Sequence, residues 1–579
     1  MERIQLLGLL ALLLGCEGAI GSAGGSGPSG MPDVPEERRG GSGSGATDGL
    51  GGGELTPDAL ACDEARRGLA EGRSQRLTSQ ELLRSLEAVF GEVMERSEVR
   101  SAAAAIPQDP PGGFLVGFDH RITNVEGVLN LARVIGTTLE GDAEARARVL
   151  GCDADDMATC EAQVVDELAP RLYRRPLTSD ERTGLFAILE EEGEHGLRFA
   201  VATLIASPHT TQRVEIDGDE AGRTVQITPH EAATRLAFRL TGEAPDEALR
   251  EAADGGRLRT LADLEREGRR LLETEPARER VRQIVLDWIH LDSVPDPNEY
   301  AAGAVGIDHE GLGAEAYEEL LRFLDYILFE ERGTFADLLL DKTVFPFTDR
   351  LATLYGVAQS EGPATLRDAR GGLLLRAGTL MSDDVVPSPI SRGVRYVEHI
   401  LCDPPGAVPP DAEDVATEIA ADYPVDEYSE RARTEAKTAG RACAGCHAER
   451  INPIGFVLAD FGPLSEPTSV ERVWDRDGSL IASHTIDAVV TNVRLRDERV
   501  DRIEGGAGLM NVLVEADAAR SCLAAEVFTR TRMRVPSAGG EDGCVLESIN
   551  TAFAEESILE GYLQSVVNDD ALIRGPFGD

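Results

Sequence analysis

The chain has 579 residues, of which 42 % are hydrophobic, so it can bury several cores and is not a disordered protein. It carries 57 Lys and Arg against 103 Asp and Glu, a formal net charge of −46. Because so acidic a surface repels phosphate backbones, the charge argues against nucleic-acid binding and favours solubility and basic partners.

The first 16 residues have the features of an export signal. Arg3 precedes the mostly apolar run 4–14, which has the length of a signal core and is too short to span a bilayer. The run ends in Leu-Leu-Gly-Cys at 13–16, which resembles a bacterial lipobox with Cys16 as the lipidated residue. An ordinary cleaved signal is the alternative, and both predict export. We expect a lipoprotein signal peptide over 1–16 and a periplasmic or cell-surface protein anchored to the outer membrane.

Residues 17–58 are rich in Gly and Ser and predict a flexible tether. The rest is predicted to be mainly α-helical, with few short strands, in segments 59–150, 151–215, 216–360, 361–505 and 506–579. Three helices are expected to start at capping boxes, where a Thr hydroxyl accepts from a backbone N–H and an acid three residues later reaches back. These are the pairs Thr78 and Glu81, Thr178 and Glu181, and Thr228 and Glu231.

Further patterns locate one long helix and two groups of strands. Apolar residues at helical spacing predict an amphipathic helix over 314–331, followed by Gly333. Residues 224–227 predict a strand, and residues 472–485 predict a hairpin around a turn at 475–478.

The nine cysteines are unevenly distributed, at positions 16, 62, 152, 160, 402, 443, 446, 522 and 544. In an oxidising compartment, cysteines that bind neither lipid nor cofactor are expected to pair. Cys152 and Cys160 bracket a short acidic loop and are expected to form a disulfide. Cys522 and Cys544 are the next plausible pair, whereas no bridge between Cys62 and Cys402 is predicted.

One motif in the sequence indicates a specific chemical function. Cys443-Ala444-Gly445-Cys446-His447 matches C-x-x-C-H, the pattern for covalent attachment of haem c. Residues at i, i+3 and i+4 share a helix face, so both thiols can bond the haem vinyl groups while His447 binds the iron as axial ligand. We expect Asn452 and Pro453 to end this short helix. The alternatives are a redox-active disulfide or half of a zinc site, although no second C-x-x-C completes a four-cysteine site.

The second axial ligand is not fixed by the pattern. Met510, Met533 and His484 lie downstream at suitable distances, and Met510 is the favoured candidate. Each methionine also fits a packing role.

The order of motifs resembles the planctomycete-type cytochrome-c-like multi-domain proteins. The resemblance rests on RLTSQELLRSLEAVFG from 76, GFDHRITN from 117, RLYRRPLTSDE from 171, ATLIASPHTTQRVE from 202, EAATRLAFRLTGEAPDEAL from 231, LDWIHLD from 286, RGGLLLRAGTLM from 370, SPISRGVRYVEHILC from 388, CAGCHAERINPIGFVLADFG from 443 and CLAAEVFTRTRMRV from 522. It implies a mainly helical haem protein with a small cytochrome-c-like haem segment in 361–505. The chain departs from the pattern at Asn452 and Gly462, where Asp is expected, and over 463–470.

These observations favour an envelope-anchored c-type haem protein that transfers electrons to an unknown redox partner. A haem-dependent oxidoreductase is the first alternative, and would require an open axial position. The second alternative is a surface lipoprotein that binds or scaffolds a polymer, with the C-x-x-C-H motif as a structural or disulfide element.

Overall fold

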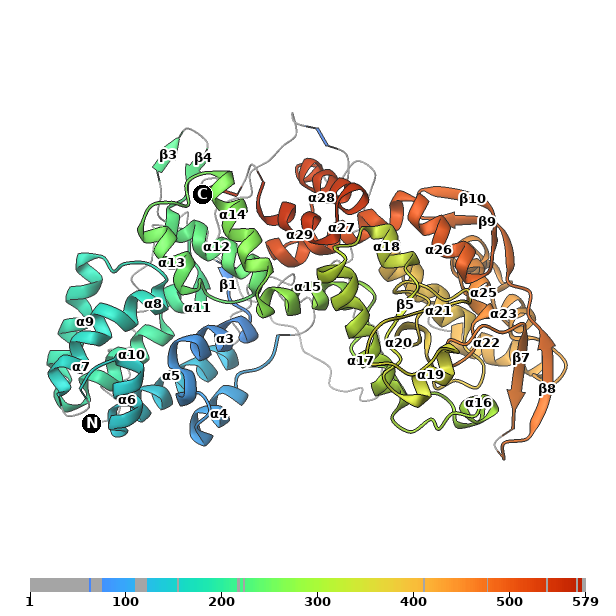
Figure 1. The fold of residues 1–579 in the computed structure, drawn as a ribbon, viewed down its shortest axis with the longest axis horizontal. Helices are drawn as coiled ribbons and strands as arrows, with labels where there is room; N and C mark the ends of the chain where they lie inside the picture. The colour runs from blue at the N-terminus through green and yellow to red at the C-terminus, as the bar shows by residue number, and fades with distance from the viewer. Residues whose placement is uncertain are drawn as a thin grey trace, which may run out of the picture. The chain divides into compact units, whose positions relative to one another are not determined.

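The structure is a computed structural model that describes residues 62–63, 75–109, 122–153, 156–215, 219–221, 224–409, 412–475, 477–537, 540–568 and 571–574. The predicted signal, Cys16 and tether lie outside these residues, as do residues 117–121 of the GFDHRITN motif. The described chain is mainly α-helical with a few short antiparallel strands, which confirms the predicted fold class (Figure 1). No helix within the described ranges combines the length and apolar character needed to cross a membrane.

The chain divides into two compact units, with the main boundary between residues 214 and 215. The first unit contains α3 (Ser79–Phe90), α4 (Ser97–Ala104), α5 (Ile122–Gly141), α6 (Ala143–Leu150), α7 (Met157–Gln163), a π-helix (Val164–Leu168), α8 (Ala169–Tyr173), α9 (Ser179–Glu191), α10 (Gly196–Ala206), α11 (Pro208–Thr211) and the strand pair β1 (Gln75–Arg76) and β2 (Gln212–Arg213). Helices α5 and α10 pack along each other. A Cβ on Gly136 would lie 2.5 Å from the carbonyl oxygen of Arg198, so this contact requires glycine.

The second unit begins with strands β3 (Asp219–Ala221) and β4 (Thr224–Gln226), and the central strand β4 pairs with both β3 and the C-terminal strand β11 (Ile573–Arg574). Its first helices are α12 (Pro229–Thr241), α13 (Glu247–Asp254), α14 (Leu261–Leu272), α15 (Glu275–Trp288), α16 (Glu299–Ala304), α17 (Leu312–Asp325) with a π-turn (Tyr326–Glu330), α18 (Phe335–Leu340) and α19 (Asp349–Tyr355). The strand pair β5 (Thr343–Val344) and β6 (Ala364–Thr365) flanks α19. The long helix expected over 314–331 is confirmed by α17 and its π-turn.

The region around the haem motif follows in the same unit. It contains α20 (Ala377–Leu380), α21 (Pro389–Arg395) with a π-turn (Tyr396–Ile400), α22 (Ala412–Ala421), α23 (Glu430–Thr438), α24 (Arg441–Cys446), a π-turn (His447–Ile451), α25 (Asn452–Val457) and a 3₁₀ turn (Leu458–Asp460). Two hairpins come next, β7 (Val470–Trp474) with β8 (Leu480–Thr485), and β9 (Val489–Leu495) with β10 (Glu498–Glu504). The last helices are α26 (Gly505–Glu515), α27 (Asp517–Arg532), α28 (Gly543–Glu555) and α29 (Ile558–Val566).

Local sequence signals explain several helix starts. All three predicted capping boxes are present, with the hydroxyls of Thr78, Thr178 and Thr228 accepting from the backbone N–H three residues later. Two further boxes at Thr260 and Thr334 use Asp instead of Glu as the reciprocal acceptor. The strand at 224–227 and the hairpin at 472–485 are also confirmed.

One hydrophobic core runs through the second unit and joins its beginning, middle and end. It includes buried residues from α12, α17, the turn after α21, α26, α27 and α29, among them Leu240, Phe323, Tyr396, Leu509, Phe528 and Tyr562. We therefore describe residues 215–579 as one unit, although three segments were expected there.

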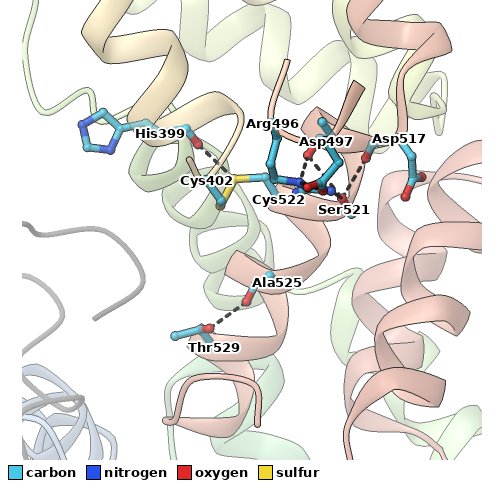
Figure 2. The surroundings of a disulfide bond; sticks show 10 residues. His399, Cys402, Arg496, Asp497, Asp517, Ser521, Cys522, Ala525 and Thr529 are labelled. Atoms are coloured by element: carbon cyan, nitrogen blue, oxygen red, sulfur yellow. Dashed lines mark hydrogen bonds and ion pairs between the residues drawn. A yellow bond between two sulfur atoms is a disulfide. The ribbon is translucent and has the colours of Figure 1, made fainter. Parts of the chain in front are cut away.

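The disulfides differ in part from the expected set. Cys152 and Cys160 are bonded, which confirms that prediction. The predicted Cys522–Cys544 bridge is wrong, because Cys522 bonds Cys402 and Cys544 bonds Cys62. Cys522 lies in α27 and Cys544 in the next helix, α28. The fold brings Cys402 to the first and Cys62 to the second, so the two neighbouring helices bond to different parts of the chain. Figure 2 shows the Cys402–Cys522 bridge, where the Cys522 sulfur lies 3.1 Å from the carbonyl oxygen of His399.

Candidate haem-attachment site

The C-x-x-C-H motif lies within a nearly continuous run of helix. Cys443 and Cys446 are in α24, His447 opens the π-turn, and Asn452 starts α25. The prediction that Asn452 and Pro453 end the helix is therefore wrong. The π-turn provides the reason: the Asn452 N–H donates to the carbonyl of His447, and Pro453 then occupies the first turn of α25, where its missing N–H is tolerated.

Glycines hold this helical run close to α21. A Cβ on Gly393 would lie 2.1 Å from the carbonyl oxygen of Ile451, and a Cβ on Gly455 would lie 1.9 Å from that of Pro389. Side chains larger than hydrogen at these two positions would push α21 and α25 apart. The glycines of the SPISRGV and NPIGF motifs therefore fix the backbone that follows His447.

Both motif thiols are free and half-buried. The other six cysteines in the described residues are all paired in disulfides. The Cys446 thiol donates to the carbonyl of Pro405 at 3.2 Å, while no bond joins it to Cys443. No disulfide joins the two motif cysteines, so both sulfurs remain available for a thioether bond.

The imidazole of His447 is held on one side only. Its Nδ1 lies 2.9 Å from the Asn452 amide oxygen, and the Asn452 amide nitrogen donates to the hydroxyl of Thr438 at 2.8 Å. Asn452 itself is 5 % exposed. With Nδ1 engaged in this way, Nε2 is the nitrogen left to bind a metal.

The segment that follows Cys402 lies against the motif. Arg450 donates to the backbone carbonyl of Asp403 at 2.6 Å and pairs with the Asp403 carboxylate at 2.7 Å. Pro405, two residues further, accepts from the Cys446 thiol. Because Cys402 is bonded to Cys522, this disulfide attaches the segment 403–405 to α27 (Figure 2).

The spacing of the two thiols and the imidazole matches the haem c pattern, and the surface beside them is open at one residue. Gly445 is exposed, and a Cβ built on it would meet no atom within 4 Å, so the motif surface is open there. Within the described ranges, no group of three or more His, Cys, Asp or Glu side chains could hold a metal ion, so the two thiols and the imidazole do not converge on one point. A zinc site needs such convergence, whereas haem c takes each thiol at a separate vinyl group and only the imidazole at iron.

The candidates for a second axial ligand are placed as follows. Met510, in α26, is 1 % exposed and lies in the hydrophobic core. Met533 follows α27 and is 8 % exposed. His484, in β8, has its Nε2 2.9 Å from the carbonyl of Val425. The burial of Met510 in the hydrophobic core accords with the packing role that each methionine also fits.

Sequence reasoning missed a cavity of about 880 Å³, including its mouth, at the other end of α23 and α25. Its wall includes Arg392, Glu466 and Phe456, together with residues of α16, α23 and β7. Burial raises the pKa of Glu466. The lining residues are scattered between positions 301 and 487, so no local pattern could have indicated them.

Two family models match the chain. PSD4, a protein of unknown function (DUF1592), matches residues 227–357, and PSCyt3, a protein of unknown function (DUF1588), matches residues 370–468. The second match contains the whole C-x-x-C-H motif and Asn452. No curated protein and no solved structure matches the chain.

Proposed function

Because the chain carries two consecutive domains of unknown function that are typical of planctomycete-type cytochrome-c-like proteins, we propose that it is a c-type haem protein that transfers electrons at the cell envelope. One observation carries the proposal. The only free thiols in the described chain share one helical segment with an imidazole whose Nε2 is available, at the i, i+3, i+4 spacing that haem attachment needs.

Cys443, Cys446 and His447 would hold the cofactor, and a bound haem supplies a one-electron ferric–ferrous couple. The thiols of Cys443 and Cys446 would each form a thioether bond to one vinyl group, with the thiol proton going to the other vinyl carbon. The Cys446 thiol would then give up its hydrogen bond to the Pro405 carbonyl. The open surface at Gly445 keeps this side of the site accessible to a redox partner. The net charge of −46 favours a basic partner.

Expression of the full chain with and without the c-type haem maturation machinery tests the proposal. We expect a Soret band, one haem per chain by pyridine haemochrome assay, and haem that stays on the chain after denaturation. Cys443→Ser with Cys446→Ser should abolish covalent attachment. The matched control is Cys152→Ser with Cys160→Ser, which removes two cysteines from the first unit and should leave haem content unchanged. A matured chain without a Soret band would rule out haem binding.

We further propose that the chain is exported and tethered to the outer membrane through a lipid on Cys16. The lipobox and the three disulfides support this, since disulfides persist outside the cytoplasm. Labelled palmitate should be incorporated into the wild-type chain and not into Cys16→Ala. Labelling that survives this substitution would contradict the tether.

A further inference from the structure

We propose that Asn452 is a positioning residue that fixes the tautomer and the basicity of the His447 imidazole, and thereby sets the reduction potential of the haem. The inference rests on the proposed function, but half of its test needs no haem.

The hydrogen bonds around Asn452 have a defined direction. The Thr438 hydroxyl donates its proton to the Thr434 carbonyl at 2.7 Å, so its oxygen can only accept from Asn452. The amide group that faces Thr438 is therefore the NH₂, which leaves the amide oxygen facing His447. An oxygen has no proton to give, so Nδ1 of His447 is the donor in this bond, and in the neutral ring Nε2 is the nitrogen with the lone pair.

Burial makes this arrangement rigid. Asn452 is 5 % exposed and Thr438 is 7 % exposed, so water competes poorly for either group. Asn452 is also the first residue of α25, whose position is fixed by the close contact of Gly455 with Pro389. The backbone that carries Asn452 therefore cannot shift easily to release His447.

The acceptor is neutral, which matters for the iron. A carboxylate at this position would accept a stronger hydrogen bond from the Nδ1–H group and make the imidazole a more basic ligand. A more basic ligand stabilises the ferric state and lowers the reduction potential. The amide of Asn452 therefore keeps the potential higher than an Asp would.

Helix α23 offers a matched pair of threonines. Thr438 anchors Asn452, whereas Thr434, one turn earlier on the same helix, is fully buried and its hydroxyl oxygen has no hydrogen-bond partner. Thr438→Val removes the anchor, and Thr434→Val removes a hydroxyl that contributes nothing to it. A general loss of packing would affect both variants, while a loss of positioning affects only the first.

The first part of the test uses the full-length chain without haem. Nitrogen-15 spectra of histidine-labelled protein, with His447 assigned by its loss in His447→Gln, report which ring nitrogen carries the proton. We expect the Nδ1–H form in the wild type and in Thr434→Val, and a mixture of both tautomers in Asn452→Leu and Thr438→Val. A wild-type chain with the proton on Nε2 would overturn the inference.

The second part measures the potential of the matured protein. Asn452→Asp should retain covalent haem and favour the ferric form by at least about tenfold, which is 59 mV for a one-electron couple. Thr434→Val should match the wild type. Unchanged potentials in both Asn452→Asp and Thr438→Val would overturn the inference, whereas absence of covalent haem in every variant, the wild type included, would count against the proposed function alone.

Discussion

Asp460 lies at the end of the 3₁₀ turn after α25, close to the wall of the cavity. Both of its carboxylate oxygens accept from the backbone N–H of Gly506, at 3.1 and 3.2 Å. Burial nevertheless dominates and raises the pKa of Asp460 to about 6, because the charged form is poorly solvated there. The folded chain therefore binds this proton more tightly than the unfolded chain does.

The raised pKa predicts a pH-dependent gain in stability for Asp460→Asn. The folded wild type loses stability as the pH rises from about 4 to about 6, since the proton must leave a buried group, and the cost is complete above pH 6. Asparagine keeps an acceptor for Gly506 without the charge. Urea unfolding should show the variant to be about 2 kcal/mol more stable at pH 7 and nearly equal to wild type at pH 4. An equal gain at both pH values would contradict this origin.

At the scale of elements, the Cys402–Cys522 bridge connects α27 to the segment that contacts the haem motif. Cys402 has a positive φ of 50°. After it, the backbone carbonyl of Asp403 accepts from Arg450, and that of Pro405 accepts from the Cys446 thiol. The neighbouring Arg496 donates to Ser521 at 2.9 Å and so braces the same turn of α27 (Figure 2). Loss of the bridge should therefore affect both the stability of the second unit and the yield of attached haem.

We expect Cys402→Ala with Cys522→Ala to lower the free energy of unfolding of the second unit by about 2–5 kcal/mol and to reduce haem incorporation. Tryptophan fluorescence is a selective probe, because both tryptophans of the chain, Trp288 and Trp474, lie in this unit. The matched control, Cys152→Ala with Cys160→Ala, should leave the fluorescence transition in place. Equal shifts in both double variants would show that the bridge has no specific role.

The elements also show what the sequence can and cannot predict. The capping box at Thr228 and the turn near Gly478 are local, and both were predicted correctly. The π-turn that follows Cys446 was not predicted, because a proline normally ends a helix. No local sequence pattern indicates a π-turn that lets the helix continue through Pro453. Asn452 was predicted as part of a helix end and noted as a departure from a family pattern, but its contact with His447 was not predicted, since the Thr438 that orients it lies 14 residues away.

At the scale of the whole molecule, the hydrophobic core shared by the beginning, middle and end of the second unit was not predicted. The Tyr562 hydroxyl donates to the carbonyl of Arg239, 323 residues away, and the disulfide of Cys544 reaches back 482 residues to Cys62. Contacts of this range depend on topology, which composition and periodicity do not contain. The same limit explains why Cys522 and Cys544 were paired wrongly.

The net charge of −46 predicts that salt stabilises the protein at neutral pH. Exposed ion pairs such as Arg148 with Glu144 contribute little each, whereas the excess carboxylates repel one another across the whole surface. Raising NaCl from 0.01 to 0.3 M shortens the screening length from about 30 Å to less than about 10 Å. Screening should weaken the repulsion among carboxylates more than it weakens the attraction within ion pairs. Tm should therefore rise by about 2–4 °C for each kcal/mol gained in the free energy of unfolding.

The control for this prediction is the same titration at pH 4.5, close to the isoelectric point, where the net charge is near zero. There the repulsion is absent and only attractive pairs remain to be screened, so salt should leave Tm unchanged or lower it. Circular dichroism melts at both pH values provide the comparison. If salt lowered Tm at pH 7 as well, the prediction would be wrong. The attraction within the Arg–carboxylate ion pairs would then contribute more to stability than the repulsion among the excess carboxylates removes.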